Sequence, residues 1–142
     1  MGLDNGILIR TKQKLSLESL PSFVNIEIDE YKMADRSGGY WYEVCYWRKC
    51  WNIRNIIIDM LPSKGEEDGT YALSKNNISQ LCHTLNSYIL NPYKWENDYE
   101  NGQTIWDSNT MLECLVHDIA NLTWLKNYMN NHKVYVEFYD SY

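Results

Sequence analysis

The sequence predicts an α+β fold in which three helices pack mainly on one face of an antiparallel sheet of four to five strands. Several short segments alternate apolar and polar residues, as strands do, and three longer segments repeat apolar residues at helical spacing. A turn-forming run at 34–39 joins two of the alternating segments, which implies antiparallel pairing. A chain of 142 residues can bury a core without a metal or a disulfide, so we expect one domain over 1–142.

The N-terminal part contributes two predicted strands. The first spans 6–12 and the second spans 23–30, with a polar connection between them. In the second strand Val24, Ile26 and Ile28 alternate with polar residues, which is typical of a strand with one face in water.

The stretch 39–62 predicts a strand that passes directly into a helix. We expect the strand over 40–46. One side carries Tyr40, Tyr42, Val44 and Tyr46, and the other carries Trp41, Glu43 and Cys45. From Trp47 apolar residues recur at three- and four-residue steps, which indicates a helix that Pro62 ends. An ion pair between Glu43 and Arg48 is predicted to hold this junction.

Two further helices and two further strands are expected after Pro62. A short extended segment over 70–73 precedes a helix that Ser74 caps and Pro92 ends. Asp107 or Ser108 is expected to cap a third helix that runs to about Asn130. The last strand is predicted over 133–140.

The third predicted helix is apolar on two sides. Its main stripe is ordinary core and consists of Met111, Leu112, Leu115, Ile119 and Leu122. The other side repeats Cys114, His117, Asn121, Trp124, Leu125 and Tyr128 at helical steps. Such a helix is either sandwiched within the domain or presents its second side to a partner.

Aromatic and acidic residues gather in the long connection 92–106. The large rings of this connection belong to Tyr93, Trp95, Tyr99 and Trp106, and its carboxylates belong to Glu96, Asp98 and Glu100. Loops of this length are often functional. The rings therefore either fold back onto the domain or form part of a recognition surface.

The net charge of −6 is unevenly distributed along the chain. Through Lys64 there are nine Lys or Arg against eight Asp or Glu, whereas from Gly65 onward there are four against eleven. An acidic second half repels nucleic acid and anionic membranes and favours partners with a basic surface. No segment is apolar enough to predict a membrane span, and we expect a cytoplasmic protein whose cysteines stay reduced.

No constellation in the sequence predicts a metal, a cofactor or a common catalytic site. Cys114 and His117 supply one close pair, whereas a structural zinc site needs four converging ligands. The alternating carboxylates of the long connection do not follow the calcium-loop pattern, since Gly102 comes one position too late. There is no glycine-rich phosphate loop, GxSxG or HExxH motif. Whether the Cys114 and His117 pair has a chemical role stays open.

Several stretches together resemble a family of small, largely uncharacterised proteins that are encoded by bacteriophages, prophages and their bacterial hosts. The matching stretches are MGLD at 1–4, EVCYWRK at 43–49, YALS at 71–74 and the aromatic ending at 139–142. The chain differs from the family pattern at 103–106, where a Phe-Phe-Gly segment is expected, and at Tyr142, where a tryptophan is expected. The resemblance implies a mobile-element origin and brings no established activity.

The sequence favours a non-enzymatic accessory protein that binds a host macromolecule, such as a component of a defence system, through an acidic and aromatic surface. The residues predicted to contact this partner are Trp95, Glu96, Asp98, Tyr99, Glu100, Trp106, His117, Trp124 and Tyr128. A homodimer is also compatible with this surface. The alternative is a nucleotide-binding module in which Trp47 and Trp51 stack on the ligand and Arg48 or Arg54 meets its phosphate.

Overall fold

The computed structural model describes residues 4–12, 27–29, 40–48, 50–61, 69–92 and 108–141. Within these ranges five strands form one antiparallel sheet, in the order β2-β3-β1-β5-β4. The strands are β1 (Asp4–Thr11), β2 (Glu27–Asp29), β3 (Tyr40–Arg48), β4 (Thr70–Ala72) and β5 (Tyr135–Ser141). The helices are α1 (Trp51–Met60), α2 (Lys75–Leu90) and α4 (Ser108–Asn131). The predicted α+β class and antiparallel sheet are confirmed.

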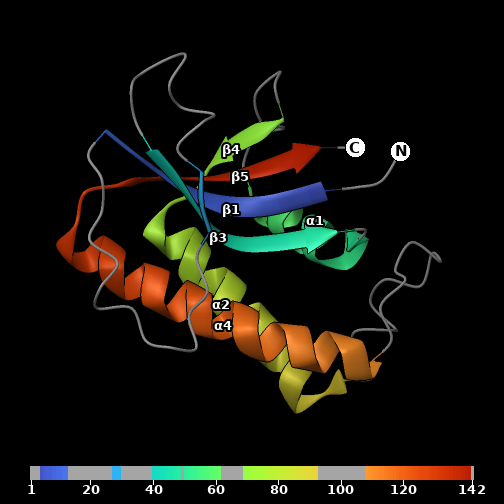
Figure 1. The fold of residues 1–142 in the computed structure, drawn as a ribbon. Coiled ribbons are helices and arrows are strands. Elements are labelled where there is room, and N and C mark those ends of the chain that lie inside the picture. The colour runs from blue at the N-terminus through green and yellow to red at the C-terminus, as the bar shows by residue number, and fades with distance from the viewer. Residues whose placement is uncertain are drawn as a thin grey trace.

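The helices and the sheet share one hydrophobic core. Helices α2 and α4 pack against each other and lie beneath the same face of the sheet (Figure 1). The core includes Ile7 of β1, Phe138 of β5, Ile57 of α1 and Leu85 of α2, all fully buried. Strand β1 lies at the centre of the sheet, between β3 and β5, and its residues from Ile7 to Ile9 are all inaccessible to solvent.

Helix α2 begins and ends where the sequence predicts. The Ser74 hydroxyl accepts a hydrogen bond from the backbone N–H of Asn77, and the Asn77 side chain accepts one from the backbone N–H of Ser74. This reciprocal capping satisfies N–H groups that the first turn of a helix leaves without partners. Its buried face consists of Ile78, Leu81, Leu85 and Tyr88.

A β-bulge in β3 makes the predicted sides of this strand wrong beyond Val44. Ile7 pairs with Cys45 and Leu8 pairs with Glu43, so Val44 is the extra residue on β3. An extra residue reverses the alternation that follows it. Cys45 is therefore buried, and Tyr46, which was predicted to share a side with Val44, is 49% exposed.

The predicted strand-to-helix boundary at Trp47 is also wrong. Strand β3 continues to Arg48, and α1 begins at Trp51 after the N-cap residue Cys50. Trp47 pairs with Asn5 of β1 and its side chain is 1% exposed, so sheet pairing and burial outweigh the local helical spacing. Among the described helices, none is long and apolar enough to cross a membrane.

Candidate functional site

Helix α4 is held in the domain on two sides. One side packs against α2, and the other is tied to β3 by two buried hydrogen bonds. Trp47 Nε1 donates to Asp118 Oδ2 at 2.8 Å, and Asn121 Nδ2 donates to the Val44 carbonyl at 2.9 Å. Leu125, which was predicted on the second side of this helix, is fully buried. Part of that second side is thus sandwiched within the domain.

The rest of the second side forms a row of rings that we call the aromatic flank, which consists of His117, Trp124, Tyr128 and His132. Trp124 and Tyr128 stack with their ring centroids 5.0 Å apart, and Tyr128 and His132 stack at 3.9 Å with an angle of 3°. Trp124 and Tyr128 are half-buried, whereas His117 and His132 are exposed. His117 lies seven residues before Trp124, two helical turns away on the same side.

Burial raises the pKa of the Tyr128 phenol, and the nearby Tyr42 of β3 raises it further. The Tyr128 phenol therefore stays neutral at neutral pH. Trp124 also packs against the hydrophobic core. The stack of Trp124, Tyr128 and His132 is therefore anchored to the domain at Trp124 and open to solvent at His132.

The aromatic flank contains the three predicted partner-binding residues that the structure describes, namely His117, Trp124 and Tyr128. The other six lie outside the described residues: Trp95, Glu96, Asp98, Tyr99, Glu100 and Trp106. His132 was not among the predicted residues. Its position four residues after Tyr128 is the signal that could have found it, because residues four apart share a helix face.

Three acidic residues of the second half of the chain have buried side chains and do not contribute to an acidic surface. Asp118, with an exposure of 8%, and Glu137, with 4%, are buried. Glu137 pairs with Arg10 at 2.6 Å, and Asp140, whose side chain is 3% exposed, pairs with Arg54 at 2.8 Å. Of the other acidic residues after Gly65, Glu113 is exposed and the rest fall outside the described ranges. The acidic character predicted for the surface is therefore smaller than the sequence count suggests.

The residues of the predicted nucleotide site do not converge on one surface. Trp47 is in the core, and the neighbouring Arg48 is exposed on the opposite face of the sheet, as adjacent strand residues are. The Arg54 guanidinium lies 5.4 Å from the centre of the Trp51 ring and is ion-paired with Asp140. Glu43, the expected partner of Arg48, accepts a hydrogen bond from the Tyr139 hydroxyl at 2.8 Å.

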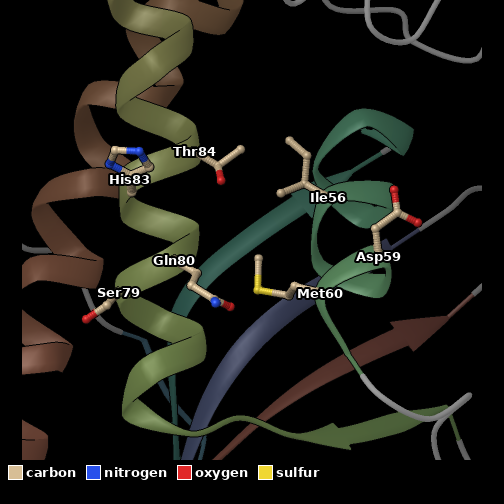
Figure 2. A pocket seen from close by; sticks show the side chains of 7 residues that line it. All are labelled: Ile56, Asp59, Met60, Ser79, Gln80, His83 and Thr84. Atoms are coloured by element: carbon tan, nitrogen blue, oxygen red, sulfur yellow. The ribbon is translucent and has the colours of Figure 1, made fainter.

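A groove of about 640 Å³ separates α1 from α2 (Figure 2). Its described lining residues are Ile56, Asp59, Met60, Ser79, Gln80, His83 and Thr84. Ile56 and Met60 point across the groove toward Thr84 and Gln80, whereas Asp59 and His83 point outward from the two rims (Figure 2). The carboxylate and the imidazole therefore do not face each other as an acid–base pair would. No sequence pattern indicates this groove, because it depends on the spacing of two helices.

The thiols of the chain are in settings that make them poor nucleophiles. Burial raises the pKa of Cys45, and it raises the pKa of Cys50 to about 12, so both remain protonated at neutral pH. Burial also raises the pKa of Cys114, and the nearby Asp118 charge adds to this effect. Among the described residues, no three or more His, Cys, Asp or Glu side chains are grouped so as to hold a metal ion.

No family model, curated protein or solved structure matches this chain. The resemblance to phage and prophage proteins stays a prediction from the sequence.

Proposed function

We propose that this protein is a non-enzymatic binding protein and that the aromatic flank of α4 is part of its contact surface for a macromolecule. The observation that carries this proposal is the continuous stack of Trp124, Tyr128 and His132, which runs from the edge of the core out to solvent. The core contribution of α4 comes from its fully buried leucines, and Tyr128 is not among the residues packed against that core, so the outer rings of the stack are not needed there.

Stacked rings suit recognition for a physical reason. Tyr128 is held between Trp124 and His132, so its side chain loses little further freedom when a partner covers it. Tyrosine and tryptophan combine a large apolar face with a hydrogen-bonding group, and both are enriched among residues that contribute most to binding. The aromatic flank is thus a pre-organised anchor.

The contact surface that we propose extends beyond the aromatic flank. A specific interface buries about 800 Å² on each partner, which is more than four side chains supply. We assign the remainder to the predicted residues of the segment 92–106, whose rings and carboxylates favour a partner with a basic surface. With the resemblance to phage and prophage proteins, this supports a host protein of the bacterial cytoplasm as the partner, for example a component of a defence system.

A matched pair of triple variants tests the proposal. His117→Ala, Tyr128→Ala and His132→Ala together remove most of the aromatic flank, while Val116→Ala, Asn127→Ala and Asn130→Ala truncate exposed residues on another side of α4. Partners captured from bacterial lysate by the wild-type chain are identified and purified. Calorimetry then measures the affinity of each purified partner for the wild-type chain and for the two triple variants. We expect the flank variant to lose at least about tenfold in affinity, or about 1.4 kcal/mol, and the control to lose less than about twofold.

The proposal is contradicted if the flank variant is folded and binds the purified partner as tightly as the control variant does. Circular dichroism establishes that both variants are folded. Size-exclusion chromatography with light scattering also reveals a homodimer, and an assembly that the flank variant alone disrupts identifies a second copy of this chain as the partner.

The groove between α1 and α2 favours a second candidate, a small-ligand module. Its volume of about 640 Å³ falls within the range of small-molecule sites. Its described lining residues include no Lys or Arg, and Asp59 points outward from its rim, which favours a neutral ligand over a nucleotide phosphate. A saturating ligand raises the thermal midpoint if it prefers the folded state. A panel of nucleotides, amines and neutral metabolites that leaves the midpoint unchanged removes this candidate.

A further inference from the structure

Asp118 is a buried carboxylate on α4, and its hydrogen bond to Trp47 is not part of the proposed contact surface. Asp118 is 8% exposed and accepts a buried hydrogen bond at 2.8 Å from the indole nitrogen of Trp47, whose side chain is itself 1% exposed. The two residues are 71 positions apart and belong to α4 and β3. This hydrogen bond therefore spans the contact between the helix that carries the aromatic flank and the sheet.

The groups around Asp118 are thiols from three elements. Burial is the largest cause that raises the pKa of Cys45 of β3, Cys50 at the start of α1 and Cys114 of α4. Each thiol is also close enough to Asp118 for the carboxylate charge to raise its pKa further, so all three are neutral at neutral pH and do not offset that charge.

The described positively charged residues nearest to Asp118 in the chain or the fold do not pair with it. Lys126 of α4 acts on Cys82 of α2, where it lowers the pKa of that thiol against the larger effect of burial. Arg48 of β3 is exposed on the opposite face of the sheet from Trp47. The amide of Asn121, one turn along α4, donates its hydrogen bond to the Val44 carbonyl. The ionised form of Asp118 is thus compensated by the Trp47 N–H and by no described positive charge.

We propose that Asp118 and Trp47 form a proton-sensitive latch that holds α4 against β3 most firmly when the carboxyl group is protonated. A neutral carboxyl group still accepts the indole hydrogen bond and avoids the free-energy cost of an ion in a buried site. Ionisation keeps the hydrogen bond but adds this cost, which weakens the contact between the helix and the strand. The latch does not depend on the identity of any partner.

The Asp118 carboxyl group changes its protonation state in the neutral pH range. Burial raises the pKa of Asp118 from 3.8 to about 7, against the smaller lowering effect of the Trp47 hydrogen bond. Because the folded state binds this proton more tightly than the unfolded state, the contribution of Asp118 to stability is complete below 3.8 and is lost as the pH rises through about 7. Acidification of a neutral solution therefore stabilises the contact between α4 and β3.

Nuclear magnetic resonance tests the latch directly. The Asp118 carboxyl carbon and the Trp47 indole N–H are followed from about pH 4 to about pH 9 in the wild-type chain, in Asp118→Asn and in the control Asp59→Asn. The amide introduced by Asp118→Asn keeps an oxygen that accepts the indole hydrogen bond but cannot ionise, and Asp59 is an exposed carboxylate on α1. We expect both wild-type signals to titrate together with a midpoint of about 7, and the indole midpoint to vanish in Asp118→Asn alone.

Thermal unfolding gives a second readout. We expect the midpoint of the wild-type chain and of Asp59→Asn to fall between about pH 5 and about pH 8, and the fall to be clearly smaller in Asp118→Asn. A wild-type Asp118 carboxyl signal that titrates near its ordinary value of 3.8 overturns the proposal, even if Asp118→Asn does not fold. An indole titration that persists unchanged in Asp118→Asn overturns it as well.

Discussion

At the residue scale, the two arginines of the predicted nucleotide site have opposite environments. Arg54 is bound to the nearly inaccessible Asp140, whereas Arg48 is exposed on β3. Truncation of one partner of a buried ion pair leaves an uncompensated charge and costs about 3–5 kcal/mol. We expect Arg54→Ala to lower the free energy of unfolding by about this amount in urea titrations. The control Arg48→Ala should change it by about 0.5 kcal/mol or less, because exposed substitutions have small effects.

Equal losses from the two arginine variants would contradict this account of Arg54. Arg54→Lys adds a finer test, since lysine keeps the charge but lacks the planar guanidinium whose Nε contacts Asp140 at 2.8 Å. We expect its stability to lie between that of the wild-type chain and that of Arg54→Ala.

Gly6 is a residue whose small size the sheet requires. A Cβ atom there would lie 2.5 Å from the Cys45 carbonyl oxygen and 2.7 Å from Cε1 of Tyr139, whose ring crosses the glycine. The carbonyl belongs to the β3 backbone, so it cannot move aside without disturbing the sheet. We expect Gly6→Ala to lower the free energy of unfolding by about 1–3 kcal/mol in urea titrations. A variant as stable as the wild-type chain would show that the strands separate freely at this point.

At the scale of single elements, α2 shows how far local signals determine structure. Ser74, the apolar stripe and Pro92 act within one short segment, so the sequence predicts the start, buried face and end of this helix. We expect Ser74→Ala to destabilise the chain by about 1 kcal/mol in thermal or urea unfolding, because the Asn77 N–H loses its partner. Ser79→Ala, inside the same helix, is the control and should have less effect. A larger loss from Ser79→Ala than from Ser74→Ala would contradict the capping role.

Strand β3 shows where local signals fail. Its alternation predicts a regular strand, but the bulge at Val44 is set by the register in which β3 pairs with Ile7 and Leu8 of β1. The helical spacing that begins at Trp47 is real in the sequence, yet that residue is drawn into the sheet by its pairing with Asn5 and its hydrogen bond to Asp118. Both determinants come from segments far away in the chain, so single-segment reasoning could not supply them.

At the scale of the whole molecule, the sequence predicts the architecture better than the surface. Counting charges along the chain could not reveal that Asp118, Glu137 and Asp140 are buried, because burial depends on which elements cover them. The groove between α1 and α2 is likewise a product of packing. The aromatic flank was partly accessible to prediction: His117, Trp124 and Tyr128 were predicted as partner-binding residues, and His132 follows Tyr128 by the same four-residue step.

The central claim is that the aromatic flank is a contact surface, and position-specific photo-crosslinking tests it most directly. A photoreactive phenylalanine analogue is placed singly at His117 or His132 on the flank, and at Val116 or Asn127 as exposed control positions on the same helix. After irradiation in bacterial lysate, we expect one discrete crosslinked partner from the flank positions, competed away by excess unlabelled chain, and none from the controls. Competable crosslinks to a partner from Val116 and Asn127 but not from His117 and His132 would contradict the claim.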